Sequence, residues 1–346
     1  MQNIATGLPF EQGFSMPAEW APHTATWMSW PFDEEMWHGH LTEVRAEYAT
    51  FVKTIARFEP VHVLLRDAEA RATAEAALKG VKDVTFHDIA LDDVWMRDNG
   101  PIFVTNKKGD IRATNWEFNS WGQKYEWDQD NLVPPLVSKH LGMSRYDIPV
   151  VMEGGSLEIN GLGTCITTEQ CLLTDTRNPT MGKADLEKVL KDNLGFTQVI
   201  WLNLGLEGDH TDGHIDTITR FSDENTILTS MTADPFDINT GRMQHNLEIL
   251  KAARNTKGEA FNVVELPLPA ARMFLEDGTR LPATYANFYI CNGAVIVPQY
   301  DDVNDKPALE VIRAAFPKHE TIGIPSRFII TGGGSFHCLT QQQPKA

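Results

Sequence analysis

The chain has 346 residues, of which 42% are hydrophobic and 22% charged, a composition that excludes an intrinsically disordered protein. Its formal net charge of −17, from 30 basic and 47 acidic residues, repels phosphates, so we expect no nucleic-acid partner and an attraction for small cations. Because no apolar run approaches the ~18 residues of a membrane helix and the N-terminus lacks a signal-like segment, we expect no membrane partner either.

The predicted elements alternate between amphipathic helices and short apolar strands. Apolar residues at three- and four-residue steps predict a helix over 40–58, followed by a strand at 60–65, a helix at 68–79 and a strand near 84–86. Further helices are expected at 130–141, 181–194, 243–254 and 305–316, and further strands at 101–105, 164–168, 198–202, 214–221, 226–231, 286–290, 294–298 and 327–331. Since no Pro- or Ser-rich linker interrupts this order, we expect one α/β domain over residues 1–346.

Two segments place an acidic residue beside glycine. In the segment Asp92–Pro101, the final Gly-Pro ends regular structure just after Asp98, so that Asp98 lies at the end of an element, either as a functional group or as a turn cap. In the segment Met152–Ser156, Glu153 precedes two glycines, which allow the backbone to approach other groups closely or simply form a turn.

The segment Gly208–Thr217 carries four ionisable residues at alternate positions. If the segment is extended, His210, Asp212, His214 and Asp216 share one face of a strand. Such groups are costly to bury without partners, and the apolar residues that follow predict an interior element. We therefore expect a functional face rather than a solvated edge.

The segment Ile330–Thr340 runs from an apolar stretch through three glycines to Cys338. A lone cysteine is usually a small core residue, and we expect that role for Cys165, Cys171 and Cys291. The glycine-rich setting makes Cys338 a candidate nucleophile instead. No C-x-x-C pair occurs among the four cysteines, which favours a reducing cytoplasm.

These groups together suit one reaction. Two carboxylates can hold a planar guanidinium through paired hydrogen bonds and direct its central carbon toward a thiolate. The cation favours the thiolate form of the cysteine, and a histidine can protonate departing ammonia and then activate water.

A series of motifs in order also resembles one family along nearly the whole chain. The motifs are Phe14–His23, Thr26–Pro31, Trp95–Pro101, Asn115–Gly122, Glu153–Ser156, Thr168–Cys171, Arg177–Pro179, Thr211–Asp216 and Gly332–Gln342. They resemble the agmatine deiminases, members of the guanidine-modifying (pentein) superfamily that also contains arginine and peptidylarginine deiminases. His210 stands where members usually carry an aspartate, and Ser335-Phe336 where they often carry Asn-Ile.

The resemblance implies roles for five residues. Cys338 would be the nucleophile and His214 the general acid and base, while Asp98 and Asp216 would hold the guanidinium. Glu153 would contact the substrate or orient His214. The implied activity converts agmatine and water to N-carbamoylputrescine and ammonia, within putrescine biosynthesis. The implied fold is a five-bladed α/β propeller of ββαβ-type units around a central site, without metal or organic cofactor.

The distal end of the substrate is less defined. Trp95 would line the pocket, and Trp121, Asp212 and Glu158 are further candidates to hold a distal ammonium. Free arginine or a peptidyl arginine remains an alternative substrate, and a symmetric homodimer is the default expectation for assembly.

Two alternatives come from other classes. Asp212–Asp216 resembles the Asp-Ala-His-x-Asp motif of metal-dependent ureohydrolases, although a second Asp-rich ligand motif is missing and Cys338 would have no role. A non-catalytic binding propeller is disfavoured because candidates for every catalytic role are present.

Overall fold

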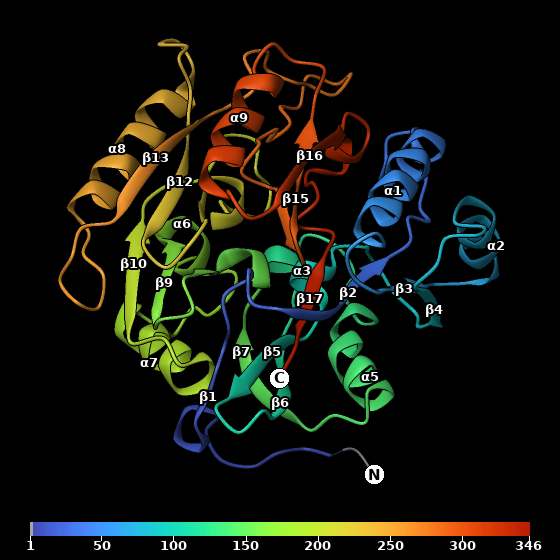
Figure 1. The fold of residues 1–346 in the computed structure, drawn as a ribbon, viewed down its shortest axis with the longest axis horizontal. Coiled ribbons are helices and arrows are strands. Elements are labelled where there is room, and N and C mark those ends of the chain that lie inside the picture. The colour runs from blue at the N-terminus through green and yellow to red at the C-terminus, as the bar shows by residue number, and fades with distance from the viewer. Residues whose placement is uncertain (1–2) are drawn as a thin grey trace.

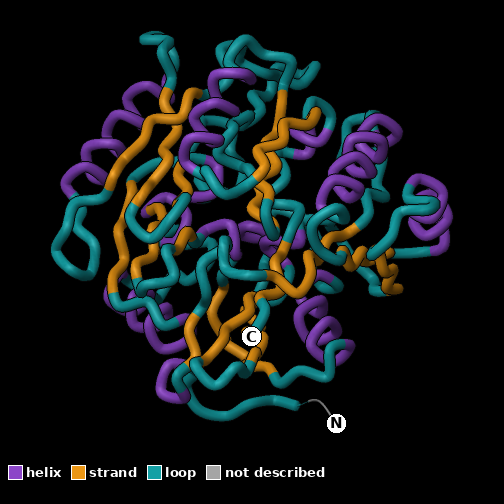
Figure 2. The backbone as a smooth tube through the Cα atoms, in the orientation of Figure 1, coloured by secondary structure: helices purple, strands orange, loops and turns teal. Residues whose placement is uncertain are grey.

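The computed structural model describes residues 3–346 and places their strands in five separate small sheets (Figures 1 and 2). All five sheets share one connectivity. An antiparallel pair of strands is followed by a helix, and the helix leads to a strand that runs parallel to the second member of the pair. The mixed α/β fold expected from the sequence is therefore present, as a repeated β-β-α-β unit.

Four of the units are continuous in sequence. The first contains β5 (Ile102–Asn106), β6 (Ile111–Glu117), α5 (Val133–His140) and β7 (Arg145–Val151), with the short strand β1 (Phe14–Ser15) at its edge. The second contains β8 (Glu158–Ile159), β9 (Thr164–Thr168), α7 (Lys183–Leu194) and β10 (Gln198–Leu202). The third contains β11 (Thr219–Phe221), β12 (Thr226–Met231), α8 (Ile238–Ala252) and β13 (Asn262–Pro267). The fourth contains β14 (Tyr289–Cys291), β15 (Ala294–Gln299), α9 (Asp305–Ala315) and β16 (Glu320–Pro325).

The fifth unit joins the two ends of the chain. Strand β17 (Gln341–Pro344) pairs antiparallel with β2 (His23–Ser29), with Gln341 opposite Trp27. Helix α1 (Leu41–Ile55) then leads to β3 (Val61–Leu65), which is parallel to β2, and α2 (Ala68–Ala77) leads to β4 (Val84–Asp88). Because Cys338 lies three positions before β17, this pairing fixes the thiol against the N-terminal part of the chain.

The long helices lie around the outside of the molecule, and the strands run inward from them (Figure 1). Helix α1 shows why. Its residues Val44, Tyr48, Phe51, Val52 and Ile55 are fully buried, as the sequence periodicity predicted, while its opposite face is exposed. Among residues 3–346, no helix combines the length and apolar character needed to cross a membrane.

A short turn precedes the first strand of every unit. These turns are α3 (Met96–Asn99) before β5, the 3-10 helix Gly154–Ser156 before β8, the 3-10 helix Ile215–Thr217 before β11, the residues around Asn287 before β14, and those around Cys338 before β17. Each of the five units therefore has one equivalent turn before its first strand. The four segments singled out in the sequence lie on four of these five turns.

Two expected strands are wrong. The segment expected at 214–221 is a strand only from Thr219, because Asp212 and Gly213 adopt positive φ angles of 66° and 84° and turn the chain. The alternating polar face therefore does not exist. The strand expected at 327–331 is instead a 3-10 helix, Ile329–Gly332, which ends at Gly333 with a φ of 92°.

Other predictions were close. The strands at 164–168, 198–202 and 226–231 are confirmed to the residue, and all six predicted helices are present. The helix expected at 130–141 begins as the 3-10 turn Asp130–Leu132. The remaining short helices are α4 (Ser120–Gln123) and α6 (Glu169–Leu172), with a 3-10 helix at Phe10–Gln12.

Replacement of Phe51 tests how the fifth unit supports the turn that carries the thiol. Phe51 is fully buried and stacks on Phe336, with the two ring centroids 4.2 Å apart. Phe336 is two residues before Cys338 in the chain. We expect Phe51→Ala to lower the free energy of unfolding by about 3–5 kcal/mol, measured by urea denaturation. The control Phe236→Ala, at a side chain that is 89% exposed, is expected to change it by about 0.5 kcal/mol or less. Equal losses in both variants would contradict this packing.

Candidate active site

Gly155 marks the centre of the site. A side-chain carbon added to Gly155 would lie 2.5 Å from His214 Nδ1, 2.8 Å from Asp98 Oδ1 and 3.1 Å from Asp216 Oδ2. Three of the predicted site residues, from two different units, therefore approach residue 155 so closely that only glycine fits there.

The Asp98 carboxyl is held entirely by neutral donors. The backbone N–H of Gly155 donates to Oδ1 at 2.9 Å, and Trp121 Nε1 donates to Oδ2 at 2.9 Å. Burial raises the pKa of Asp98 to about 6; His214 and Trp121 oppose this increase, and Asp216 and Glu153 add to it. Asp98 is thus the carboxyl of the site that changes charge closest to neutral pH.

His214 lies between two carboxylates without touching either at hydrogen-bond distance. Its Nδ1 is 3.7 Å from Asp98 Oδ1 and its Nε2 is 3.6 Å from Glu153 Oε2, and neither nitrogen has a hydrogen-bond partner within residues 3–346. Burial alone would lower the pKa of His214, but Asp98 and the neighbouring Cys171 and Glu153 raise it well above its usual value. The imidazole is therefore a proton carrier, with both ring nitrogens available.

Glu153 and Asp216 each have a permanent partner. Arg177 Nε donates to both Glu153 oxygens at 2.9 Å, and Arg177 with His214 lowers the pKa of Glu153 despite its burial. The Asp216 carboxyl contacts His337 Nδ1 at 2.7 Å, and this contact lowers the pKa of Asp216 despite burial. Both groups are therefore carboxylates across the ordinary pH range.

The Cys338 thiol completes the group. Its sulfur lies 3.5 Å from Asp216 Oδ2 and accepts a hydrogen bond from Asn287 Nδ2 at 3.1 Å. Burial raises the pKa of Cys338 well above its usual value, and Asp216 and Asp98 raise it further. The thiol is protonated until a positive charge enters beside it.

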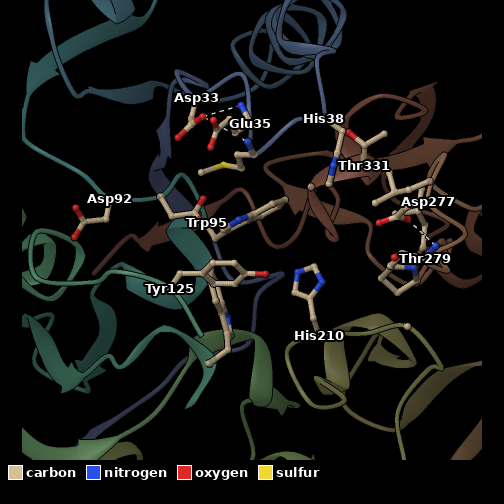
Figure 3. Close-up of a pocket in the computed structure, with 18 of the residues that line it drawn as sticks. Asp33, Glu35, His38, Asp92, Trp95, Tyr125, His210, Asp277, Thr279 and Thr331 are labelled. Atoms are coloured by element: carbon tan, nitrogen blue, oxygen red, sulfur yellow. Dashed lines mark hydrogen bonds between the residues drawn. The ribbon is translucent and has the colours of Figure 1, made fainter. Parts of the chain in front are cut away.

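A cavity of about 560 Å³ lies beside this group and shares with it the side chains of Trp95 and Trp121 (Figure 3). Trp95, Trp121, Tyr125 and His210 form part of its wall, and the Trp121 ring reaches through to Asp98. Gly334 separates the wall from the thiol, because a side-chain carbon there would lie 2.7 Å from Trp95 and 3.2 Å from Cys338 Sγ. The predicted pocket residues Trp95 and Trp121 are therefore placed between solvent and the buried groups.

Two acids expected near the substrate are engaged elsewhere. Asp212 accepts from Lys124 Nζ at 2.8 Å and from Arg177 at 2.9 Å, so that it braces the arginine that holds Glu153. Glu158 accepts from Arg220 at 2.8 Å and from the backbone N–H of Phe221. Neither carboxylate lines the cavity.

Several groups at the site escaped the sequence prediction. They are Arg177, Asn287, His337 and Cys171. Two of them carry a signal in the sequence: Arg177 belongs to the motif Arg177–Pro179, and His337 is adjacent to Cys338. Asn287 carries none, because it lies in an ordinary apolar stretch. Cys171 is buried in an apolar cluster, as expected, but its sulfur also lies 3.9 Å from Glu153 Oε2. Cys165 and Cys291 are buried in apolar clusters, as expected.

Comparison with known proteins assigns the chain to a family. Residues 15–344 match the model of the Porphyromonas-type peptidyl-arginine deiminases. The chain belongs to this family. It is 38% identical to the agmatine deiminases of Stutzerimonas stutzeri and Pseudomonas aeruginosa, over 98% of this chain and 98% of each relative.

Solved structures of family members agree over the full length. Agmatine deiminase of Enterococcus faecalis superposes with a TM-score of 0.94 at 32% identity, covering 100% of both chains. A substrate-bound cysteine-to-serine variant of C. jejuni agmatine deiminase superposes with a TM-score of 0.89 at 33% identity, covering 96% of this chain and 97% of that one.

The Asp98 environment gives a pH test. We expect affinity for agmatine in a Cys338→Ala protein to fall as the pH drops through about 6, because protonation of Asp98 removes a negative charge. Trp121→Phe removes a donor that favours the charged carboxyl, and should move the midpoint upward by about one pH unit. The affinity is measured by calorimetry across pH. The control is Trp116→Phe, which should leave the midpoint unchanged because the ring nitrogen of Trp116 donates to Thr114 and not to Asp98. An unchanged midpoint in Trp121→Phe would contradict the role given to Trp121.

Proposed function

We propose that this protein is an agmatine deiminase that converts agmatine and water to N-carbamoylputrescine and ammonia. The observation that carries the proposal is the convergence of Asp98, His214 and Asp216 on Gly155, beside the Cys338 thiol that lies 3.5 Å from Asp216 Oδ2. Relatives at 38% identity over nearly the full length bear the same name.

The guanidinium binds next to the carboxyls of Asp98 and Asp216. Asp216 Oδ1, which lacks a hydrogen-bond partner within residues 3–346, accepts one N–H, and the Asp98 carboxylate accepts others. The cation relieves the repulsion that keeps Cys338 protonated, so that substrate binding itself favours the thiolate. This arrangement holds the guanidinium carbon against the sulfur.

The reaction then proceeds in two halves. The Cys338 thiolate forms a C–S bond with the guanidinium carbon, and the His214 imidazolium gives its proton to the departing ammonia. The neutral imidazole next removes a proton from water, the resulting oxygen attacks the thiouronium carbon, and the C–S bond breaks to release the ureido product. Glu153, held by Arg177, keeps the imidazole oriented and favours its protonated form.

The cavity favours agmatine over arginine. Six carboxylate residues line it, whereas its two arginines are Arg66 and Arg280, and the latter is paired with Asp237. The carboxylates are those of Asp33, Glu35, Asp92, Asp93, Glu126 and Asp277. An ammonium tail meets favourable charge there, while the α-carboxylate of free arginine or the bulk of a peptidyl arginine does not.

The metal-dependent alternative lacks an assembled site. Asp212 faces Lys124 and Arg177 rather than joining His214 and Asp216 around one point. The ureohydrolase-like motif in the sequence therefore has a structural use as an ion-pair brace.

We propose further that the five sheets are the blades of one propeller-like catalytic domain over residues 1–346, closed by the pairing of β17 with β2. The shared connectivity and the delivery of one turn from each unit to the site support this arrangement. A symmetric homodimer stays a prediction.

The direct test is ammonia release from agmatine, arginine and a peptidyl arginine offered side by side. Agmatine should give the highest kcat/KM, and Cys338→Ala should lower it by at least about a thousandfold because the covalent step is lost. The matched control Cys165→Ala removes a buried thiol remote from the site and should retain turnover. Full activity in Cys338→Ala, or a clear preference for arginine, would refute the proposal.

Asp93 gives a test of how the tail is held. Its carboxyl lines the cavity, and burial together with Asp130 raises its pKa well above the usual value. Within residues 3–346 no cation pairs with it, so an entering ammonium would be its partner. Asp93→Asn should reduce kcat/KM for agmatine by about 10–100-fold but that for butylguanidine, which has no ammonium, by less than about threefold. As a control, Glu126→Gln changes an exposed carboxylate of the same cavity and should reduce the kcat/KM for neither substrate by more than about threefold. If Asp93→Asn lowers kcat/KM equally for both substrates, Asp93 does not hold the ammonium.

A further inference from the structure

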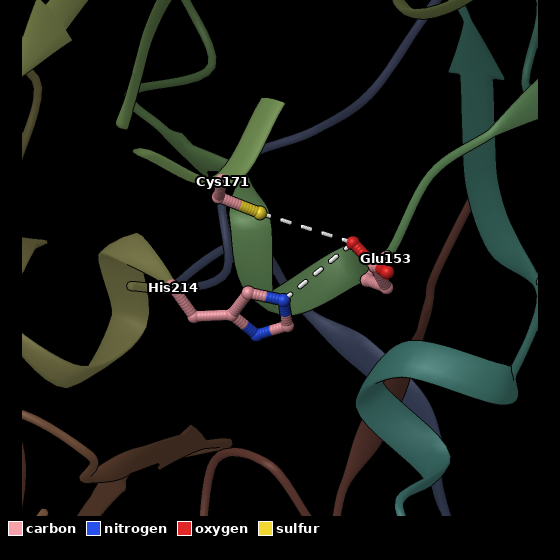
Figure 4. A group of neighbouring side chains, drawn as sticks. All are labelled: Glu153, Cys171 and His214. Carbon is pink, nitrogen blue, oxygen red and sulfur yellow. Dashed lines mark hydrogen bonds and ion pairs between the residues drawn. The ribbon is translucent and has the colours of Figure 1, made fainter. Parts of the chain in front are cut away.

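Behind the imidazole of His214 lies a second thiol that the proposed reaction does not use. Cys171 from the short helix α6 and Glu153 from the turn before β8 face His214, and their side chains point toward one another (Figure 4). The sulfur, one imidazole nitrogen and one carboxylate oxygen all lie within 4.8 Å of each other. All three residues are buried.

The spacing of these atoms approaches that of metal ligands. Tetrahedral zinc, with bonds of about 2.3 Å to sulfur and about 2.0–2.2 Å to nitrogen and oxygen, needs ligand atoms about 3.3–3.7 Å apart. His214 Nε2 lies 3.6 Å from Glu153 Oε2, and Cys171 Sγ lies 3.9 Å from the same oxygen. Both separations lie within a few tenths of an ångström of that range.

A second observation points to a ligand. His214 is fully buried, yet neither ring nitrogen has a hydrogen-bond partner within residues 3–346. A buried polar atom without a partner is costly, so the Nε2 lone pair is available to a cation. The sulfur and imidazole ligands select a soft metal such as Zn²⁺ or Cd²⁺ over Mg²⁺ or Ca²⁺.

The charges of the site also balance. Arg177, which donates to both Glu153 oxygens, adds one positive charge next to the cation. A Cys171 thiolate, the Glu153 carboxylate and the Asp98 carboxylate near Nδ1 offset the three positive charges of the metal and Arg177. On binding, the Cys171 thiol and the His214 imidazolium each lose one proton, so that affinity increases with pH.

We propose that Cys171, His214 and Glu153 form an inhibitory site for a thiophilic divalent cation. The metal occupies the nitrogen that faces Glu153 and prevents His214 from carrying protons. The inhibitory consequence rests on the proposed function of His214, whereas the binding itself does not.

The binding is tested without turnover. Full-length Cys338→Ala protein, which lacks the competing nucleophilic thiol, is titrated with Cd²⁺ alone, and the ultraviolet charge-transfer absorption of the thiolate–cadmium bond is followed. We expect one equivalent to produce the absorption, and the added change Cys171→Ser to abolish it. The added change Cys165→Ser, at a buried thiol away from His214, should preserve it. Equal absorption with and without Cys171, or none in either protein, would overturn the proposal.

Two further variants test the role of His214 in Cd²⁺ binding and the role of Cys171 in inhibition by Zn²⁺. His214→Gln in the Cys338→Ala background retains both Cys171 and Glu153, and should weaken Cd²⁺ binding by at least about tenfold. With Cys338 present, Zn²⁺ should inhibit agmatine turnover, and Cys171→Ser should raise the half-inhibiting concentration by at least about tenfold relative to that variant's own activity. Equal inhibition of both proteins would place the metal on Cys338 and overturn the assignment. Absence of turnover in the unmodified protein would instead refute the proposed function and leave the cadmium result standing.

Discussion

Burial of three carboxyls around one imidazole is the constraint on which the site depends. Glu153 and Asp216 meet it with permanent partners, Arg177 and His337, and their pKa values are lowered. Asp98 has only neutral donors, and its pKa is raised. Asp98 is thus the carboxyl of the three that lacks a permanent partner, and it lies beside Gly155, where an entering positive charge would stabilise it. A guanidinium supplies that charge in the planar form that two carboxylates can hold.

The repeated β-β-α-β unit explains how distant residues meet. Each unit starts with a turn before its first strand, and these turns carry Asp98, the Glu153–Ser156 segment, His214 with Asp216, Asn287 and Cys338. The groups are far apart in sequence but equivalent in the connectivity of their units. The strand pairing of β17 with β2 joins the last turn to the N-terminal part of the chain within the fifth unit. Rigid strand ends therefore set the distances, and the intervening helices can vary without moving the site.

The sequence predicted the chemistry better than the geometry. Asp98, Glu153 and Cys338 were singled out because each lies in a segment that contains glycine, and His214 and Asp216 because they alternate with other ionisable residues. The resemblance to the agmatine deiminases supplied the roles of all five residues. The alternating face at 210–216 was wrong, since positive φ angles at Asp212 and Gly213 break the strand that local periodicity predicted. Asn287 and Cys171 could not be found, because their importance comes only from tertiary contacts with Cys338 and Glu153.

The same features that prepare His214 for proton transfer also expose it to metals. Both nitrogens of His214 are without hydrogen-bond partners in the described chain, so that either can accept or release a proton. A carboxylate must stand near it to favour the imidazolium, and Glu153 does so. Once a thiol lies beside that carboxylate, as Cys171 does, the ligand set of a soft cation is nearly complete. Arg177 opposes the cation by its charge, and the bracing of Arg177 by Asp212 is therefore a means of controlling metal affinity as well as of orienting Glu153.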